Sequence, residues 1–216
     1  MREQLIQKVL DKKIVAIVRG VYGEDCLNLA RALYAGGIEL LEVTFDQSKP
    51  QLWERTCDTI RQLVEQLGDK MAFGAGTVTT VEMVELAKRA GAKFIVSPDT
   101  NEAVIRATVA AGMISMPGAM TPTEVVTAHA FGADFVKLFP AGSMGAGYLK
   151  AVTAPLNHIR LLAVGGIHEK NVGEFMAAGA VGVGVGGNLV NKTWIKNGEF
   201  DKLTATAKEL VKNAGL

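Results

Sequence analysis

The chain has 216 residues, enough to bury a sizeable core as one large domain or two small ones. Its formal net charge is +1 and it has no Lys/Arg-rich block, so neither nucleic acid nor a membrane is an expected partner. The two cysteines and three histidines are scattered without the spacing of metal ligands, so no metal is expected. Residues 1–6 are mixed and charged and no apolar run reaches bilayer-spanning length, which predicts a cytoplasmic protein.

Apolar runs alternate with helical patterns along the chain, and each pair of them predicts a strand followed by a helix. In chain order we expect a helix at 3–11, a strand at 14–18, a helix at 24–34, a strand at 40–45, a helix at 51–67, a strand at 71–77, a helix at 80–89, a strand at 94–97, a helix at 102–110, a strand at 114–116, a helix from Thr121, a strand at 135–139, a helix at 146–152, a strand at 161–164, a helix at 169–178, a strand at 181–185 and a helix at 202–213.

A glycine recurs between a predicted helix and the predicted strand that follows it. A glycine stands where a helix must end in a left-handed turn, directly before an apolar strand. The positions are Gly37, Gly91, Gly112, Gly132 and Gly179. Strands this apolar are buried on both faces, which indicates a parallel sheet covered by helices. Eight such units predict a TIM (β/α)8 barrel with an extra N-terminal helix, as one domain over residues 1–216. A doubly wound sheet is the alternative, but it rarely uses eight even units.

The predicted strand from Phe135 to Phe139 carries Lys137 at its centre, and Pro140 ends the run. An ammonium group buried in such a strand faces a large desolvation cost, so the amine should lose its proton more easily. A neutral buried amine is a nucleophile toward carbonyl carbons. The alternative is a lysine near a strand end that extends outward to solvent.

Chemistry in a TIM barrel lies at the C-terminal ends of the strands. In the second predicted strand Glu42 and Thr44 share one face, and Lys137 shares a face with Phe135 and Phe139. If both faces point into the barrel, a carboxylate and an amine meet in a closed space. The two readings are a buried salt bridge that holds the barrel and a catalytic acid/base pair, and we favour the second.

Glycine pairs follow the last two predicted strands, Gly165-Gly166 and Gly186-Gly187. Barrels commonly bind a phosphate here through backbone N–H groups, although tight turns need glycine too. Arg19, at the end of the first strand, is a candidate to hold an anionic group of a substrate or to pair with Glu42.

Taken in order, the motifs resemble those of the KDPG/KHG aldolase family, the class I aldolases for 2-keto-3-deoxy-6-phosphogluconate and 4-hydroxy-2-oxoglutarate. The resemblance covers essentially the whole chain. Its motifs are Leu41–Phe45, Gly74–Val78, Phe94–Pro98, Met116–Gly118, Thr121–Glu124, Val136–Ala141 and Gly165–Ile167.

The resemblance implies a role for each candidate residue. Lys137 matches the Schiff-base lysine and Glu42 the general acid/base. Thr77 matches the residue beside the pyruvate carboxylate, Pro98 and Phe139 line the pocket, and Arg19 contacts substrate in relatives that carry it. Gly165, Gly166, Gly186 and Gly187 fall where the family binds phosphate. It also implies a homotrimer that needs no metal or other cofactor and acts on a small 2-keto acid.

Three positions depart from many of the gluconate-type members, which have arginine where this chain has Asp46, threonine where it has Val164 and serine where it has Gly187. Valine before Gly-Gly is closer to the galactonate-type relatives. These differences leave open the configuration at carbon 4 and the strength of phosphate binding, for which Asn188 is a replacement ligand.

The expected reaction is cleavage of a 2-keto-3-deoxy-6-phospho sugar acid to pyruvate and glyceraldehyde 3-phosphate. A second expected substrate is 4-hydroxy-2-oxoglutarate, which would be cleaved to pyruvate and glyoxylate. Alternatives are 2-keto-3-deoxy-6-phosphogalactonate aldolase, a phosphate-binding isomerase or epimerase that needs no covalent amine, and a binding protein without turnover.

Overall fold

The structure, a computed structural model, describes residues 2–216 apart from the side chain of Asn188. Nine strands form one parallel sheet in the order β5-β4-β3-β2-β1-β9-β8-β7-β6. The strands are β1 (Ile14–Val18), β2 (Leu40–Thr44), β3 (Ala72–Gly76), β4 (Phe94–Val96), β5 (Ile114–Met116), β6 (Gly118–Ala119), β7 (Val136–Leu138), β8 (Leu161–Val164) and β9 (Gly182–Val185).

The two edges of this sheet are consecutive pieces of chain, β5 and β6, separated only by Pro117. Ahead of the proline, the Met116 carbonyl accepts a hydrogen bond from the Ser97 N–H at 3.2 Å. The Pro117 carbonyl then accepts from the Lys137 N–H at 2.8 Å, on the other side. Proline has no N–H to donate, so the ladder is interrupted there and the strand changes partner. The expected eight-stranded barrel is therefore confirmed, with its fifth strand in two parts.

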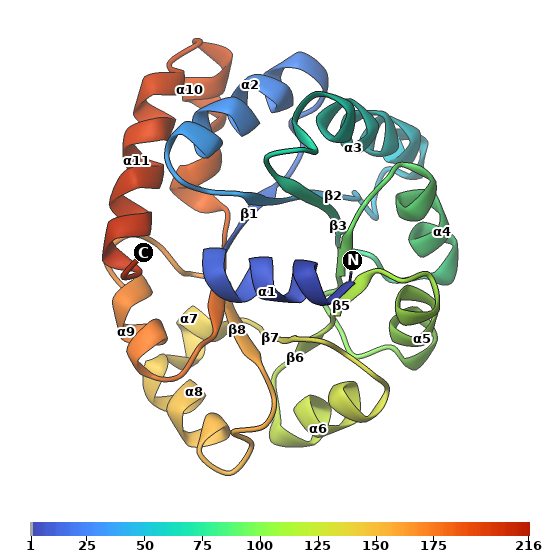
Figure 1. The fold of residues 1–216 in the computed structure, drawn as a ribbon, viewed down its shortest axis with the longest axis vertical. Coiled ribbons are helices and arrows are strands. Elements are labelled where there is room, and N and C mark those ends of the chain that lie inside the picture. Colours follow the sequence, from blue (N-terminus) through green and yellow to red (C-terminus); the bar gives the residue numbers. More distant parts are fainter. Residues whose placement is uncertain (1) are drawn as a thin grey trace.

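Helices surround the strands in a ring (Figure 1). The ring consists of α2 (Gly23–Ala35), α3 (Trp53–Leu67), α4 (Val81–Arg89), α5 (Glu102–Ala110), α6 (Pro122–Ala130), α7 (Ala141–Met144), α8 (Ala146–Thr153), α9 (Val172–Ala177), α10 (Lys192–Lys196) and α11 (Phe200–Asn213). The remaining elements are the helix α1 (Arg2–Lys12) and the 3-10 turns η1 (Pro50–Leu52) and η2 (Gly187–Val190). The sequence did not predict α7, α10, η1 or η2, because elements of three to five residues are too short to show a helical period.

The helix α1 does not join the outer ring. It crosses the middle of the ring of strands in Figure 1. Its apolar side chains Leu5, Ile6, Val9 and Leu10 pack on the residues that fill the barrel interior, among them Phe94. The first helix thus closes the N-terminal end of the barrel, and the opposite end is left for a site.

Two features are absent from the described residues 2–216. No helix among them is both long and apolar enough to cross a membrane. They also contain no cluster of three or more His, Cys, Asp or Glu side chains able to hold a metal ion.

Candidate active site

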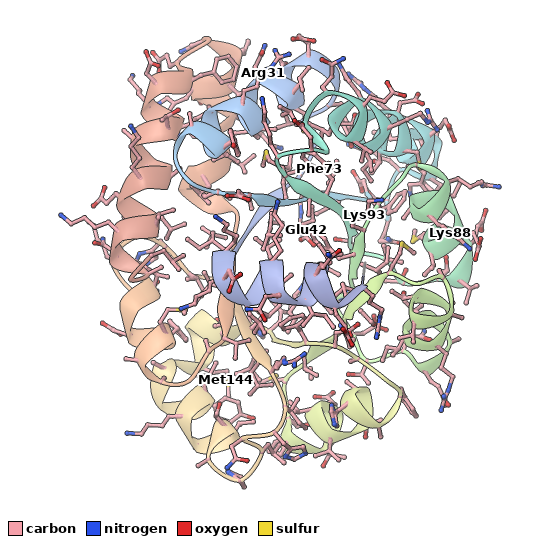
Figure 2. The ribbon with its side chains drawn as sticks, in the orientation of Figure 1. Arg31, Glu42, Phe73, Lys88, Lys93 and Met144 are labelled. Atoms are coloured by element: carbon pink, nitrogen blue, oxygen red, sulfur yellow. The ribbon has the colours of Figure 1, made fainter. Side chains whose placement is uncertain are left out.

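Alternation along the strands directs Glu42 and Lys137 into the barrel. Leu40 precedes Glu42 on one face of β2. Phe135, just before β7, precedes Lys137 with the same two-residue spacing. Leu40 and Phe135 both belong to the interior core. Glu42 is 2% exposed and Lys137 is 8% exposed. Figure 2 shows the labelled Glu42 within the ring of strands, whereas Arg31 and Lys88 lie on the outer helices.

A cavity of about 750 Å³ opens at the C-terminal end of the barrel. The ten residues to which the resemblance gives a catalytic, substrate-binding or phosphate-binding role all line it. They are Arg19, Glu42, Thr77, Pro98, Lys137, Phe139, Gly165, Gly166, Gly186 and Gly187. The C-terminal ends of seven strands (β1, β2, β3, β4, β7, β8 and β9) therefore contribute to one space, as the order of strands in a barrel predicts.

Apolar walls decide the electrostatics of the two buried groups. Val96, Met116 and Leu162 are among the side chains that surround Glu42 and Lys137. Burial raises the pKa of the Glu42 carboxyl to about 7, against the smaller lowering effects of Lys137 and Arg19. Burial lowers the pKa of the Lys137 ammonium, with Glu42 opposing the shift and Arg19 adding to it. Each group is thus brought closer to neutrality at physiological pH, as acid–base and nucleophilic chemistry require.

Glu42 does not form the salt bridge that was the alternative reading. Lys137 and Arg19 act on it through charge alone, without a hydrogen bond, and its buried Oε2 has no hydrogen-bond partner among the described residues. A buried carboxyl oxygen without a partner is costly in a purely structural role. The carboxyl lies directly over Gly76, where a Cβ atom would come within 2.7 Å of Glu42 Cδ. The glycine of β3 is therefore what makes room for the acid.

Thr77 follows β3 with a φ of +56°, in the left-handed region that β-branched residues rarely adopt. Gln47 holds it there, since its Nε2 donates a hydrogen bond of 2.6 Å to the Thr77 carbonyl. Gln47 is held in turn by the hydroxyl of Thr79, which donates to Oε1 at 3.2 Å. Backbone strain of this kind collects at functional sites, where it fixes the direction of a side chain. Sequence reasoning did not find Gln47, because nothing in its local pattern indicates a contact thirty residues away.

Phe139 connects the lysine to the first glycine loop. Lys137 Nζ lies 4.8 Å from the centre of the Phe139 ring. The same ring lies against Gly165, where a Cβ atom would meet Phe139 Cδ2 at 3.0 Å. Gly165 also has a φ of +90°, so its conformation and its neighbour both require glycine.

The loop after β8 is fixed by Asn171. Its Nδ2 donates to the Gly166 carbonyl at 2.9 Å, and its Oδ1 accepts from the His168 N–H at 2.8 Å. Two further residues that line the cavity near these glycines, His168 and Lys192, were not singled out from the sequence. The side chain of Asn188, the suggested replacement ligand, lies outside the described residues.

Asp46, which stands where gluconate-type relatives have arginine, does not line the cavity. Its Oδ1 accepts hydrogen bonds from the Ser48 N–H at 3.0 Å and the Ser48 hydroxyl at 2.6 Å. Its carbonyl accepts from Trp53 Nε1 at 3.0 Å. Asp46 therefore stabilises a turn. Val164 and Gly187, the other two departures, both line the cavity.

A parallel barrel with a buried amine and a buried carboxyl in one cavity at the C-terminal ends of its strands defines a barrel enzyme of carbonyl or proton-transfer chemistry. Comparison with known proteins identifies the family within this class of barrel enzymes. The family model described as KDPG and KHG aldolase matches residues 5–206.

Individual relatives agree with the family match. The chain is 37% identical over 177 residues to 2-dehydro-3-deoxy-6-phosphogalactonate aldolase of Escherichia coli K12, covering 82% of this chain and 83% of that protein. It is 34% identical to 2-dehydro-3-deoxy-phosphogluconate aldolase of Treponema pallidum, covering 94% of each. It also superposes with a TM-score of 0.84 and 27% identity on KDPG aldolase from Legionella pneumophila, solved with pyruvate captured as a covalent carbinolamine intermediate, covering 95% of this chain and 97% of that one. The chain belongs to the KDPG and KHG aldolase family and is a lyase.

Proposed function

We propose that the protein is a class I aldolase that cleaves a 2-keto-3-deoxy-6-phospho sugar acid through an imine on Lys137. The observation that carries the proposal is the cavity in which an amine of lowered pKa and a carboxyl with a pKa of about 7 share apolar walls. The Legionella relative supports it, because a carbinolamine is the adduct of an amine with a carbonyl carbon.

The reaction follows from these two groups. The neutral Lys137 amine adds to the keto carbon C2, and loss of water gives an iminium that acts as an electron sink. Glu42 removes the proton of the C4 hydroxyl, and the C3–C4 electrons move into the iminium as that bond breaks. An aldehyde leaves, and the remaining enamine is protonated at C3 and hydrolysed to pyruvate and free Lys137. Because the iminium carries the positive charge, the steps use no metal or other cofactor.

The remaining residues position the substrate. Thr77 and Arg19 contact the pyruvate carboxylate or the hydroxyls, and Pro98 and Phe139 form walls. The backbone of Gly165, Gly166, Gly186 and Gly187 receives the phosphate. A homotrimer in the cytoplasm stays the predicted assembly and location, and sedimentation of the purified protein tests the former.

A second candidate within the same chemistry is the galactonate-type substrate. Val164 lines the cavity, and the relative from Escherichia coli K12 carries the galactonate name. Measuring pyruvate release from 2-keto-3-deoxy-6-phosphogluconate, its galactonate epimer and 4-hydroxy-2-oxoglutarate tests the proposal and ranks the substrates. Release from at least one of the phosphorylated acids is expected. Release from none of the three would overturn the proposal.

A further inference from the structure

We propose that Lys192 and His168 form a side-chain site for the phosphate group of the substrate and make the enzyme selective for phosphorylated aldehydes. The proposal rests on the aldolase function proposed above. It assigns two side chains next to the glycine pairs, in addition to the glycine backbone, to the recognition of one end of the substrate.

Both residues lie at the glycine end of the cavity. His168 follows Gly165-Gly166 in the loop after β8, and Lys192 begins α10 after the Gly186-Gly187 turn. Both line the same cavity as Lys137 and Glu42. A substrate bound to Lys137 through one end can therefore present its other end to these two side chains.

The charges around the cavity favour an anion there. Arg19 and Lys192 are the cations at its exposed rim, while Glu42, the one acidic residue among the described residues that line it, is buried at its floor. Lys192 Nζ lies beside Gly20, 3.2 Å from the position of a Cβ atom there, and the ion pairs among the described side chains do not include it. An unpaired ammonium at a rim without carboxylates is a ready phosphate ligand.

Hydrogen bonds orient His168 as a donor. Its Nδ1 accepts the Lys170 N–H at 3.2 Å. In the neutral ring the proton therefore resides on Nε2, which is left to donate. The backbone adds two donors, because the N–H groups of Gly166 and Ile167 have no acceptor among the described groups of the chain. One ammonium, one ring N–H and two backbone N–H groups match the several acceptor oxygens of a phosphate.

Aldol addition of pyruvate to three aldehydes tests the site. Glyceraldehyde 3-phosphate carries the phosphate, glyceraldehyde lacks it, and glyoxylate carries a carboxylate instead. Lys192→Met should lower kcat/KM for glyceraldehyde 3-phosphate about 10- to 100-fold, the range for a hydrogen bond to a charged group. It should leave glyceraldehyde unchanged and affect glyoxylate less. His168→Ala should lower the phosphate value by about 2- to 10-fold, and Lys192→Arg should retain most of it.

Lys196→Met is the matched control, because it removes the same charge from the exposed end of the same helix and does not line the cavity. Equal losses in Lys192→Met and Lys196→Met, or equal losses for all three aldehydes, would overturn the proposal. Binding of inorganic phosphate, followed by ³¹P NMR, gives a readout independent of turnover and should weaken in Lys192→Met and in His168→Ala but not in Lys196→Met. If borohydride traps no pyruvate on the wild-type protein, the aldolase function fails, and the phosphate measurement still decides on Lys192.

Discussion

The two ends of the barrel are built from the same strands and have opposite characters. At the N-terminal end α1 closes the barrel with apolar side chains such as Ile6 and Val9. At the C-terminal end the interior opens into the 750 Å³ cavity with its buried acid and amine. The change takes place within two residues of one strand, since Leu40 belongs to the closed end and Glu42 to the open end. Stability and chemistry are thus divided between the two ends of the barrel, and substitutions at the two ends should have different consequences.

The largest expected effect is that of Glu42→Gln on turnover. Loss of the general acid/base should lower kcat about 10²- to 10⁴-fold. The control is Glu39→Gln at the start of the same strand region, where Glu39 pairs with Lys8 and Lys12 near the closed end. Its kcat should stay at the wild-type value. Steady-state kinetics with the preferred phosphorylated acid measures kcat of both variants. Comparable losses of kcat in the two would contradict the functional difference between the two ends of the barrel.

The same carboxyl should make stability depend on pH. The pKa of Glu42 is raised from 4.5 to about 7 in the folded state, so between these values the unfolded chain loses a proton that the folded chain keeps. Wild-type stability should therefore fall as pH rises through this window, by about 3 kcal/mol at most, and level off above it. Urea unfolding of the wild type and of Glu42→Gln tests this. As the pH is raised from about 5 to 8, the free energy of unfolding of the wild type should fall relative to that of the variant. A constant difference across that range would show that burial does not raise the pKa.

Gly76→Ala tests the open end without removing a functional group. The new Cβ would meet Glu42 Cδ at 2.7 Å, so the carboxyl must move. Misplacement of a catalytic group by about 1 Å costs about 10²-fold in rate. Gly147→Ala in α8, where a Cβ meets nothing within 4 Å, is the control and should turn over normally. Normal kcat in Gly76→Ala would mean that the position of Glu42 is not critical.

The smallest expected effect is that of Val9→Ala at the closed end. Val9 is fully buried between α1 and the barrel interior. Loss of two methyl groups there should lower the free energy of unfolding by about 2 kcal/mol and leave kcat of the folded enzyme unchanged. Chemical unfolding and kinetics on the same preparation measure both quantities. A loss of kcat that matches the loss of stability would contradict the division between the ends.

Much of the barrel can be predicted from the sequence because its strands are continuous apolar runs between helices that end in glycine. The alternation that places Leu40 and Glu42 on one face needs only the period of a strand. The break at Pro117 was not predicted, because the exchange of partners depends on which strands lie on each side. Short elements such as α7 and α10 were missed for lack of a period.

The site divides in the same way. Lys137 and Glu42 could be found because a charged residue inside an apolar strand is conspicuous. Gln47, His168 and Lys192 lie in polar loops, where such residues are ordinary, and only the folded chain brings them to the cavity or to Thr77. Asp46 stands out in the sequence because gluconate-type relatives have arginine there, but the structure places it in a turn.

The central claim is that burial leaves one ε-amino group neutral enough to form an imine with a keto acid. Borohydride added with pyruvate reduces that imine to a stable amine, and peptide mass spectrometry locates it. We expect a single adduct on Lys137, and Lys137→Met should lose both this adduct and activity. An adduct on another lysine, or none in an active enzyme, would contradict it.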